Sequence, residues 1–235
     1  MLKIPLRAVV LAFVLSIATP GFSSTIAYDQ AAQIFGNQPW LGSLGMDFQV
    51  LQPIVVTEIG VFSNNAYGLT TASPGTNLNA AIFGLPVGYS STSGTIVSGT
   101  AVSFLTGTTY SVTDNWLFQP ITSVVLQPGY YTIVAQGYNT SDMNGNLLGS
   151  SALPASTENT GGGLISFGGT ARYESSQPGS LTNPATFPST LDGGPSNRYY
   201  AGDFQYAAAP VPEPVSMLLI GLGLVGLGLR RRWQS

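Results

Sequence analysis

The sequence predicts an all-β protein, a single β-sandwich or jelly-roll-like domain between two terminal targeting segments. Short runs alternate apolar and polar residues with a period of two, and Gly, Pro, Asn and Ser cluster between these runs. Apart from the two termini, no window of about twelve residues has a helical period. Many short strands separated by turn residues are typical of sandwiches and jelly rolls.

The expected strands follow one another between residues 46 and 206. In the first of them, Met46, Phe48 and Val50 face one way, and two polar residues face the other. Residues 139–197 are rich in Gly, Ser, Asn and Pro, so we expect mostly loop there, with one short strand. The predicted strands are Met46–Leu51, Ile54–Phe62, Leu78–Gly84, Thr95–Val97, Ala101–Leu105, Asn115–Ile121, Ser123–Leu126, Tyr130–Tyr138, Gly163–Phe167 and Arg198–Tyr206.

The clearest turn signal lies at Pro128-Gly129, ahead of the most regular of these strands. Proline fixes φ at the second turn position and glycine accepts a positive φ at the third. The pattern therefore predicts a type II turn between Leu126 and Tyr130.

The N-terminus has the pattern of a secretory signal peptide. Lys3 and Arg7 precede an apolar run, Ala8–Ala18, and small residues follow the helix breakers Pro20 and Gly21. The run is too short to span a hydrocarbon core of about 30 Å. We therefore expect export through the Sec translocon and cleavage by signal peptidase after Ser23, with the Ser16/Ala18 pair as the alternative site.

The C-terminus has three parts in a fixed order. A Pro-rich linker at residues 207–214 leads into the apolar run Val215–Leu229, which is followed by Arg230, Arg231 and Arg232. Positive residues stay cytoplasmic, so the run is predicted to be a transmembrane helix with the body on the far side of the inner membrane. Its four glycines make it a poor permanent anchor.

The motif Pro212-Glu213-Pro214, followed by an apolar helix and an arginine cluster, resembles the PEP-CTERM sorting signal of Gram-negative exopolysaccharide producers. The resemblance implies that exosortase, a membrane transpeptidase, removes the tail during export. It also implies a transient inner-membrane anchor, a final location at the cell surface or outside the cell, and exopolysaccharide as a candidate partner. An ordinary single-span anchor is the alternative.

The expected organisation is therefore a signal peptide (1–23), a β-domain (24–206), a linker with the motif (207–214), a transmembrane helix (215–229) and a cytoplasmic basic tail (230–235). The body also resembles the DUF4082-like β-sandwich group, through Gly45–Val50, Ile54–Phe62, Val124–Ile133 and the closing Gly202–Tyr206. Two positions depart from that pattern, with Phe62 for the usual Tyr and Asp203 for the usual Asn. That group has no established activity, so the resemblance implies a fold only.

Composition excludes several kinds of chemistry. The chain has no Cys and no His, which removes disulfides, Cys- or His-ligated metals and His-dependent triads. The body between residues 24 and 206 has two arginines and nine acidic residues, a net charge of −7. Such a surface does not suit nucleic acid, because phosphate binding depends on Lys and Arg.

Few residues remain that could form a site, and we expect no cofactor, no metal and no catalytic activity. A glycosidase needs two converging carboxylates, and Glu58, Glu158 and Glu174 show no such pairing in the sequence. Asp142, Asn144 and Asn146 resemble half of a calcium loop, but Leu153 stands where the bidentate Glu belongs.

Aromatic residues offer another kind of contact, because they can stack on sugars. Trp116 lies among apolar residues and is expected to pack in the core, whereas Trp40 is a candidate glycan contact. The leading hypothesis is an exported surface or extracellular-matrix protein, and the alternative is a glycan-binding module for the cell's own exopolysaccharide.

Overall fold

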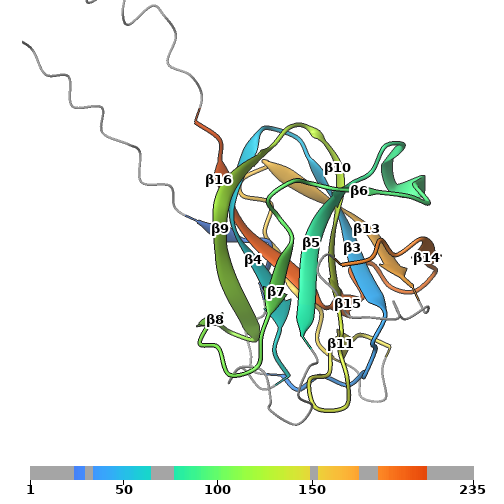
Figure 1. Ribbon diagram of the computed structural model, residues 1–235. Coiled ribbons are helices and arrows are strands. Elements are labelled where there is room, and N and C mark those ends of the chain that lie inside the picture. The colour runs from blue at the N-terminus through green and yellow to red at the C-terminus, as the bar shows by residue number, and fades with distance from the viewer. Residues whose placement is uncertain (1–23, 30–33, 65–76, 149–152, 175–184, 211–235) are drawn as a thin grey trace, which may run out of the picture.

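The computed structural model describes residues 24–29, 34–64, 77–148, 153–174 and 185–210 (Figure 1). These residues form strands and loops, with one 3-10 turn, η1 (Gly88–Ser90), and no α-helix among them. The all-β class predicted from the sequence is confirmed. Within the described ranges, no helix is long and apolar enough to cross a membrane.

The strands are short, and most of them lie in two larger sheets. In chain order they are β1 (Thr25–Ile26), β2 (Tyr28–Asp29), β3 (Ser43–Val50), β4 (Ile54–Phe62), β5 (Leu78–Gly84), β6 (Thr95–Ile96), β7 (Val102–Phe104), β8 (Ser111–Thr113), β9 (Trp116–Leu126), β10 (Gly129–Gln136), β11 (Gly145–Asn146), β12 (Thr157–Glu158), β13 (Ile165–Tyr173), β14 (Thr190–Asp192), β15 (Tyr199–Tyr200) and β16 (Gly202–Ala208).

One sheet has the strand order β1-β16-β4-β9-β8, and the other has the order β14-β13-β3-β10-β5-β6, with β7 also paired to β5. The pairs β11-β15 and β12-β2 form two small sheets. Neighbouring strands in the chain often belong to different sheets, as β3 and β4 do, so the chain crosses repeatedly between the two (Figure 1).

The apolar side chains of the two larger sheets pack against each other. The rings of Phe48 on β3 and Phe204 on β16 lie 4.6 Å apart between centroids. The Tyr138 hydroxyl, fully buried, donates to the carbonyl of Ala201 at 2.6 Å and accepts from the amide of Phe62 at 3.0 Å. A buried tyrosine after β10 thus joins the last residue of β4 to the residue after β15, and both its donor and an acceptor position are used.

Both faces of β3 are covered, which its alternating sequence did not predict. Asp47 lies on the face opposite Met46 yet is buried, and its carboxylate accepts from Arg172 Nε at 2.6 Å. Arg172 also donates to the carbonyls of Ser91 at 2.5 Å and Tyr89 at 2.6 Å. The ion pair therefore fixes η1 over the outer face of the second sheet.

The strands Ile54–Phe62 and Leu78–Gly84 have the predicted bounds, but β1, β2 and β8 were not predicted, and the prediction was wrong in other places. The two strands predicted at 115–126 are one strand, β9, in which Pro120 sits at an irregularity opposite Glu58. The strand predicted at 198–206 divides into β15 and β16. The strand predicted at 163–167 runs on to Tyr173, and residues 139–197 hold three more short strands, β11, β12 and β14.

The predicted type II turn at Pro128-Gly129 is also wrong. Gly129 has no positive φ; it pairs with Val50 as the first residue of β10. The reason is that β9 and β10 lie in different sheets, so the two residues between them form a crossing and not a hairpin turn. The signal peptide with Ser23, the motif Pro212-Glu213-Pro214, the run Val215–Leu229 and Arg230–Arg232 lie outside the described residues.

Candidate functional site

A hollow of about 240 Å³ lies where four separated segments of the chain meet. It is slightly smaller than the roughly 300–1,000 Å³ of enclosed small-molecule sites, so it suits one unit of a chain molecule better than an enclosed cofactor. We call it the Trp40 pocket; it is lined by Gln38, Trp40, Tyr173, Asp192, Arg198 and Tyr199.

Strand pairing brings these residues together from distant parts of the sequence. Tyr173, the last residue of β13, pairs with Leu44, and Leu44 follows Trp40 closely in the chain. Tyr199 on β15 pairs with Asn146 on β11, and Gln38 forms an isolated bridge with Asn144. Asp192, the last residue of β14, pairs with Ala171 on β13. The pocket therefore depends on long-range pairings, which no local pattern in the sequence records.

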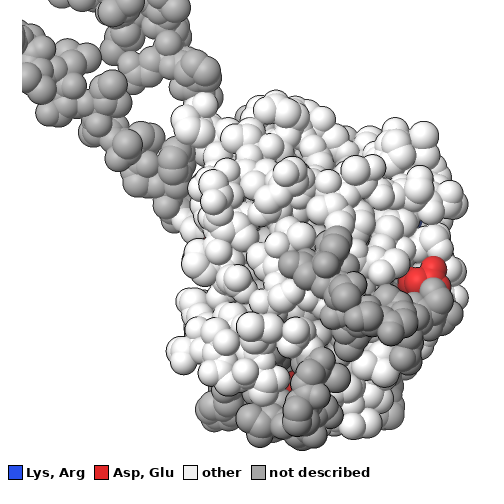
Figure 2. All heavy atoms as spheres, viewed as in Figure 1, with Lys and Arg blue, Asp and Glu red and all other residues white. Residues whose placement is uncertain are grey.

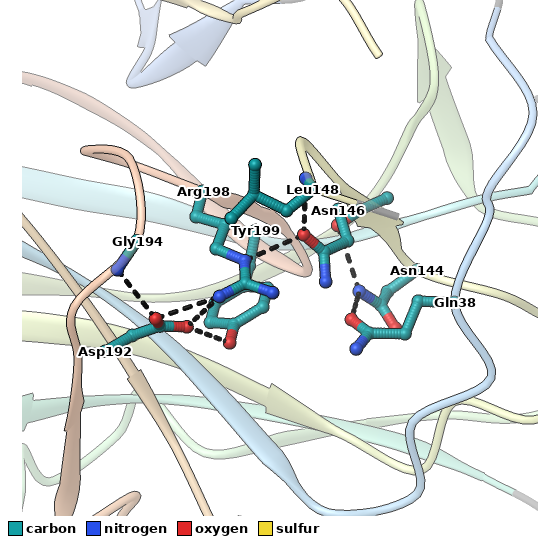
Figure 3. Close-up of polar contacts among 9 residues, drawn as sticks. Gln38, Asn144, Asn146, Leu148, Asp192, Gly194, Arg198 and Tyr199 are labelled. Carbon is teal, nitrogen blue, oxygen red and sulfur yellow. Dashed lines mark hydrogen bonds and ion pairs between the residues drawn. The ribbon is translucent and has the colours of Figure 1, made fainter. Parts of the chain in front are cut away.

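The polar side of the pocket is a connected network (Figure 3). Arg198 Nη1 donates to Asp192 Oδ1 at 2.9 Å and Oδ2 at 2.7 Å, and Arg198 Nε donates to Asn146 Oδ1 at 2.8 Å. Asp192 also accepts from the Tyr199 hydroxyl and from the Gly194 amide, at 2.8 Å for the latter. Asp192 is thus held by a guanidinium, a hydroxyl and a backbone N–H.

These contacts fix the charge of the pocket. Burial alone would raise the pKa of Asp192, but the hydrogen bonds from Tyr199 and Gly194 and the Arg198 charge outweigh it, so this pKa lies below its usual range. Burial, the hydrogen bond to Asp192 and the charge of Asp192 raise the pKa of Tyr199. At neutral pH the pocket therefore holds a carboxylate, a guanidinium and a neutral phenol.

Two donors of the pocket remain available to a ligand. Asn144 Nδ2 donates to Gln38 Oε1 at 3.0 Å, which orients the Gln38 amide (Figure 3). Among the described residues, neither Gln38 Nε2 nor Arg198 Nη2 has a hydrogen-bond partner. The geometry thus offers two planar donors beside one carboxylate acceptor.

The aromatic side of the pocket is formed by Trp40, Tyr173 and Tyr199. The rings of Trp40 and Tyr173 meet edge to face with centroids 6.1 Å apart, and Arg198 Cζ lies 5.2 Å from the centroid of the Tyr199 ring. Trp40 is half-buried, and its indole N–H is turned into the protein beside Gly42. A Cβ at Gly42 would lie 2.9 Å from this nitrogen and 1.9 Å from the Glu174 carbonyl oxygen, so only glycine fits there.

The other residues considered from the sequence lie elsewhere. Trp116 is buried in the core beside Phe62, with ring centroids 5.8 Å apart. Glu58 lies on β4, Glu158 lies on β12, and Glu174 follows β13 and accepts from Ser189 Oγ at 3.0 Å.

Two residues of the calcium-like segment serve the protein's own network. Asn146 Oδ1 accepts from Arg198 and from the Leu148 amide, and Asn144 bonds Gln38. The described residues contain no group of three or more Asp, Glu, His or Cys side chains that could hold a metal ion.

Trp40 is the one pocket residue that the sequence pointed to, and Gln38, Tyr173, Asp192, Arg198 and Tyr199 were missed. The sequence contained a signal for Arg198, because the body has only two arginines. In the structure each of them forms an ion pair with an aspartate. Asp192 and Tyr173 lie in the part of the chain that was expected to be mostly loop, and nothing local distinguishes them.

The comparisons with known proteins concern the end of the chain. The family profile of the PEP-CTERM protein-sorting motif matches residues 210–232. Neither a curated protein nor a solved structure matches the chain. The resemblance of the body to the DUF4082-like group stays a prediction. The chain thus carries a PEP-CTERM sorting motif, which implies an exported protein with a membrane-associated sorting tail and exosortase as its processing partner.

Proposed function

We propose that the protein is a non-enzymatic component of the cell surface or extracellular matrix of a Gram-negative exopolysaccharide producer. The sorting motif supports this, because it directs a protein to exosortase. In this proposal the Sec translocon and signal peptidase handle residues 1–23, the run Val215–Leu229 holds the precursor transiently in the inner membrane, and the β-domain at residues 24–206 is the part that functions outside.

We also propose that the two larger sheets form a β-sandwich, as expected from the sequence. The contact between Phe48 on β3 and Phe204 on β16 supports this arrangement. So does the close approach at Gly202, where an added Cβ would lie 2.8 Å from Cγ1 of Ile133 on β10. Such contacts join inner faces of two sheets that are not hydrogen-bonded to each other.

A second function, glycan binding, is favoured by the Trp40 pocket. Sugars present apolar ring faces that pack on aromatic side chains and hydroxyl groups that need both donors and acceptors. The pocket combines aromatic rings with the free donors of Arg198 and Gln38 and the carboxylate of Asp192. Preordered planar groups lose little side-chain entropy on binding.

The charge of the body narrows the class of glycan. With a net charge of −7 between residues 24 and 206, the body repels polyanions, and Asp192 already neutralises Arg198 in the pocket. We therefore propose neutral sugar units of the exopolysaccharide as the ligand. The pocket contains a single carboxylate, and glycoside hydrolysis normally needs two, so binding without cleavage is the function that its chemistry favours.

The test uses the exported protein purified from its host and the host's exopolysaccharide. Trp40→Ala and Arg198→Gln should each weaken binding by roughly ten-fold, a loss of about 1.4 kcal/mol. Tyr130→Ala is the matched control, because Tyr130 is an exposed aromatic residue outside this pocket. Wild-type affinity in both pocket variants, with unchanged thermal unfolding, would show that the exopolysaccharide does not bind in the Trp40 pocket.

A further inference from the structure

The first and last described strands are hydrogen-bonded neighbours. β1 and β16 are antiparallel, with Thr25 opposite Tyr206 and Ile26 opposite Gln205. The Ser24 hydroxyl donates to Gln205 Oε1 at 2.9 Å. In an antiparallel pair the start of one strand lies beside the end of the other. The described chain therefore begins and ends on the same side of the body, next to β16 (Figure 1).

Several other strands begin or end at this end of the body, and the segments there contain no charged residue. The pairings place Val50, Gly84 and Gly129 together in one sheet, and Ile54, Leu126 and Ala208 together in the other. The uncharged segments at these strand ends are 24–26, 50–54, 84–88, 95–98, 124–130, 161–165 and 206–210.

Exposed apolar side chains mark the same end. Leu51, Val87, Val125 and Tyr130 are exposed by 45%, 69%, 49% and 38%. Asp114 and Glu174 lie next to the opposite strand ends, at β9 and β13, and Asp192 pairs with Ala171, in the half of β13 that leads to Tyr173. In Figure 2 the surface beside the two chain ends is white, and the red carboxylates visible in this view lie away from it.

The sorting motif follows this end closely. The last residue of β16 is Ala208, and the Ala209 amide still donates to the Pro53 carbonyl at 3.0 Å. Val215, where the apolar run begins, is seven positions beyond Ala208, so a fully extended chain spans at most about 25 Å between them. The tether is therefore too short to hold the body far from the membrane in which the tail is inserted.

We propose that this tail-proximal face, marked by Leu51, Val87, Val125 and Tyr130, rests on the outer leaflet of the inner membrane while the sorting tail is inserted. The partner is a lipid surface, and the proposal rests on the sorting motif and not on glycan binding. The uncharged face brings no carboxylate near anionic headgroups. It also lacks the basic residues that would retain the body after cleavage, so the contact ends when the tail is removed.

The orientation also affects the Trp40 pocket. Along β13, Ile165 lies opposite Val50 at the tail-proximal face, whereas Tyr173 lies opposite Leu44 at the other end of the strand pair. The pocket, which Tyr173 lines, is therefore directed away from the bilayer in the membrane-held precursor.

The absence of cysteine from the chain allows a clean test with single-cysteine variants. Leu51→Cys and Val125→Cys place thiols on the tail-proximal face, and Leu148→Cys, at a position 59% exposed beside β11 at the other end, is the matched control. The precursor is held in membranes of a host without exosortase and labelled with a membrane-impermeant maleimide. Thermal unfolding of each released variant checks that the fold is kept.

Labelling at positions 51 and 125 should be several-fold slower in the membrane-held precursor than in the released protein, and labelling at position 148 should not change. A Gly/Ser spacer of about 20 residues between Pro210 and Val211 should restore fast labelling of the precursor, because it lets the body move away from the bilayer. Equal rates at position 51 in both forms, equal protection at position 148, or protection that persists with the spacer would overturn the proposal.

Discussion

Replacing Asp203 by asparagine should stabilise the body at neutral pH. The side chain of Asp203 is fully buried, and its Oδ1 accepts from the amides of Tyr28 at 3.1 Å and Phe204 at 2.7 Å. Its other oxygen, Oδ2, has no partner among the described residues. Burial, the largest influence, raises the pKa of Asp203 well above its usual range despite the two N–H donors.

The size of the stability change depends on the unpaired Oδ2 of Asp203. A buried group without a hydrogen-bond partner costs about 1–3 kcal/mol, and more when it is charged. Asparagine keeps the acceptor for both amides and puts an uncharged, still unpaired Nδ2 in the place of Oδ2. Asp203→Asn should therefore gain the difference between a charged and an uncharged unpaired group, about 1–3 kcal/mol at pH 7. For a domain of about 150–250 residues, each kcal/mol corresponds to about 2–4 °C in Tm.

The raised pKa of Asp203 determines how the stability of the body changes with pH. The folded pKa of Asp203 is raised, so its contribution to stability is fully present below the unfolded pKa of about 4 and is lost as pH rises through the folded pKa. Urea unfolding from about pH 4 to about pH 8 should show a difference between wild type and Asp203→Asn that grows with pH. Asp203→Leu, which leaves both amides without an acceptor, should be destabilised throughout. A lower stability of Asp203→Asn than of wild type at pH 7, or two parallel curves, would contradict the raised pKa of Asp203.

Three further changes test other parts of the structure. Arg172→Leu leaves Asp47 as an unpaired buried carboxylate and should cost roughly 3–5 kcal/mol in guanidinium unfolding; a cost within experimental error would show that the pair does not fix η1. Tyr138→Phe removes the hydroxyl that bonds Ala201 and Phe62 and should cost about 1–3 kcal/mol in the same assay, with unchanged affinity for glycan as the contrasting readout. Because the folded pKa of Asp192 is lowered, the Trp40 pocket should stay assembled as pH falls through the usual aspartate range and loosen only below it. Tryptophan fluorescence, compared with that of Trp40→Phe to remove the contribution of the other tryptophans, follows this change, and loosening that begins above that range would contradict the assigned ion pair.

The fold class and the longest strands could be predicted because their signals are local. The alternating residues of β4, the continuous apolar run in β5 and the turn residues that flank both strands give their bounds correctly. What the alternation cannot give is the environment of each face. Asp47 is polar and is nevertheless buried, because η1 and Arg172 cover the outer face of β3.

The short strands of residues 139–197 could not be predicted for a related reason. β11, β12 and β14 have two or three residues each, and each exists because of a distant partner, as Thr157 does opposite Asp29. The same holds for the Trp40 pocket, where Trp40 and Arg198 are brought together by several strand pairings. A pattern of spacing within one segment carries no information about such contacts.

The sorting tail is the opposite case, because its meaning depends on sequence alone. The motif has two prolines, Pro212 and Pro214, and Glu213 is the one acidic residue of the tail. The order of motif, apolar run and arginine cluster was sufficient to predict exosortase as the processing partner, in agreement with the family profile at residues 210–232.

The mass of the protein released by its own host tests the central claim most directly. If exosortase processes the chain, the released protein lacks Arg230–Arg232, and its N-terminus begins after the predicted signal peptide, at residue 24. Glu213→Ala should leave the unfolding of the body unchanged and accumulate in the inner membrane as a precursor with an intact tail. Released wild-type protein that still carries Arg230–Arg232, or normal release of Glu213→Ala, would contradict sorting by this tail.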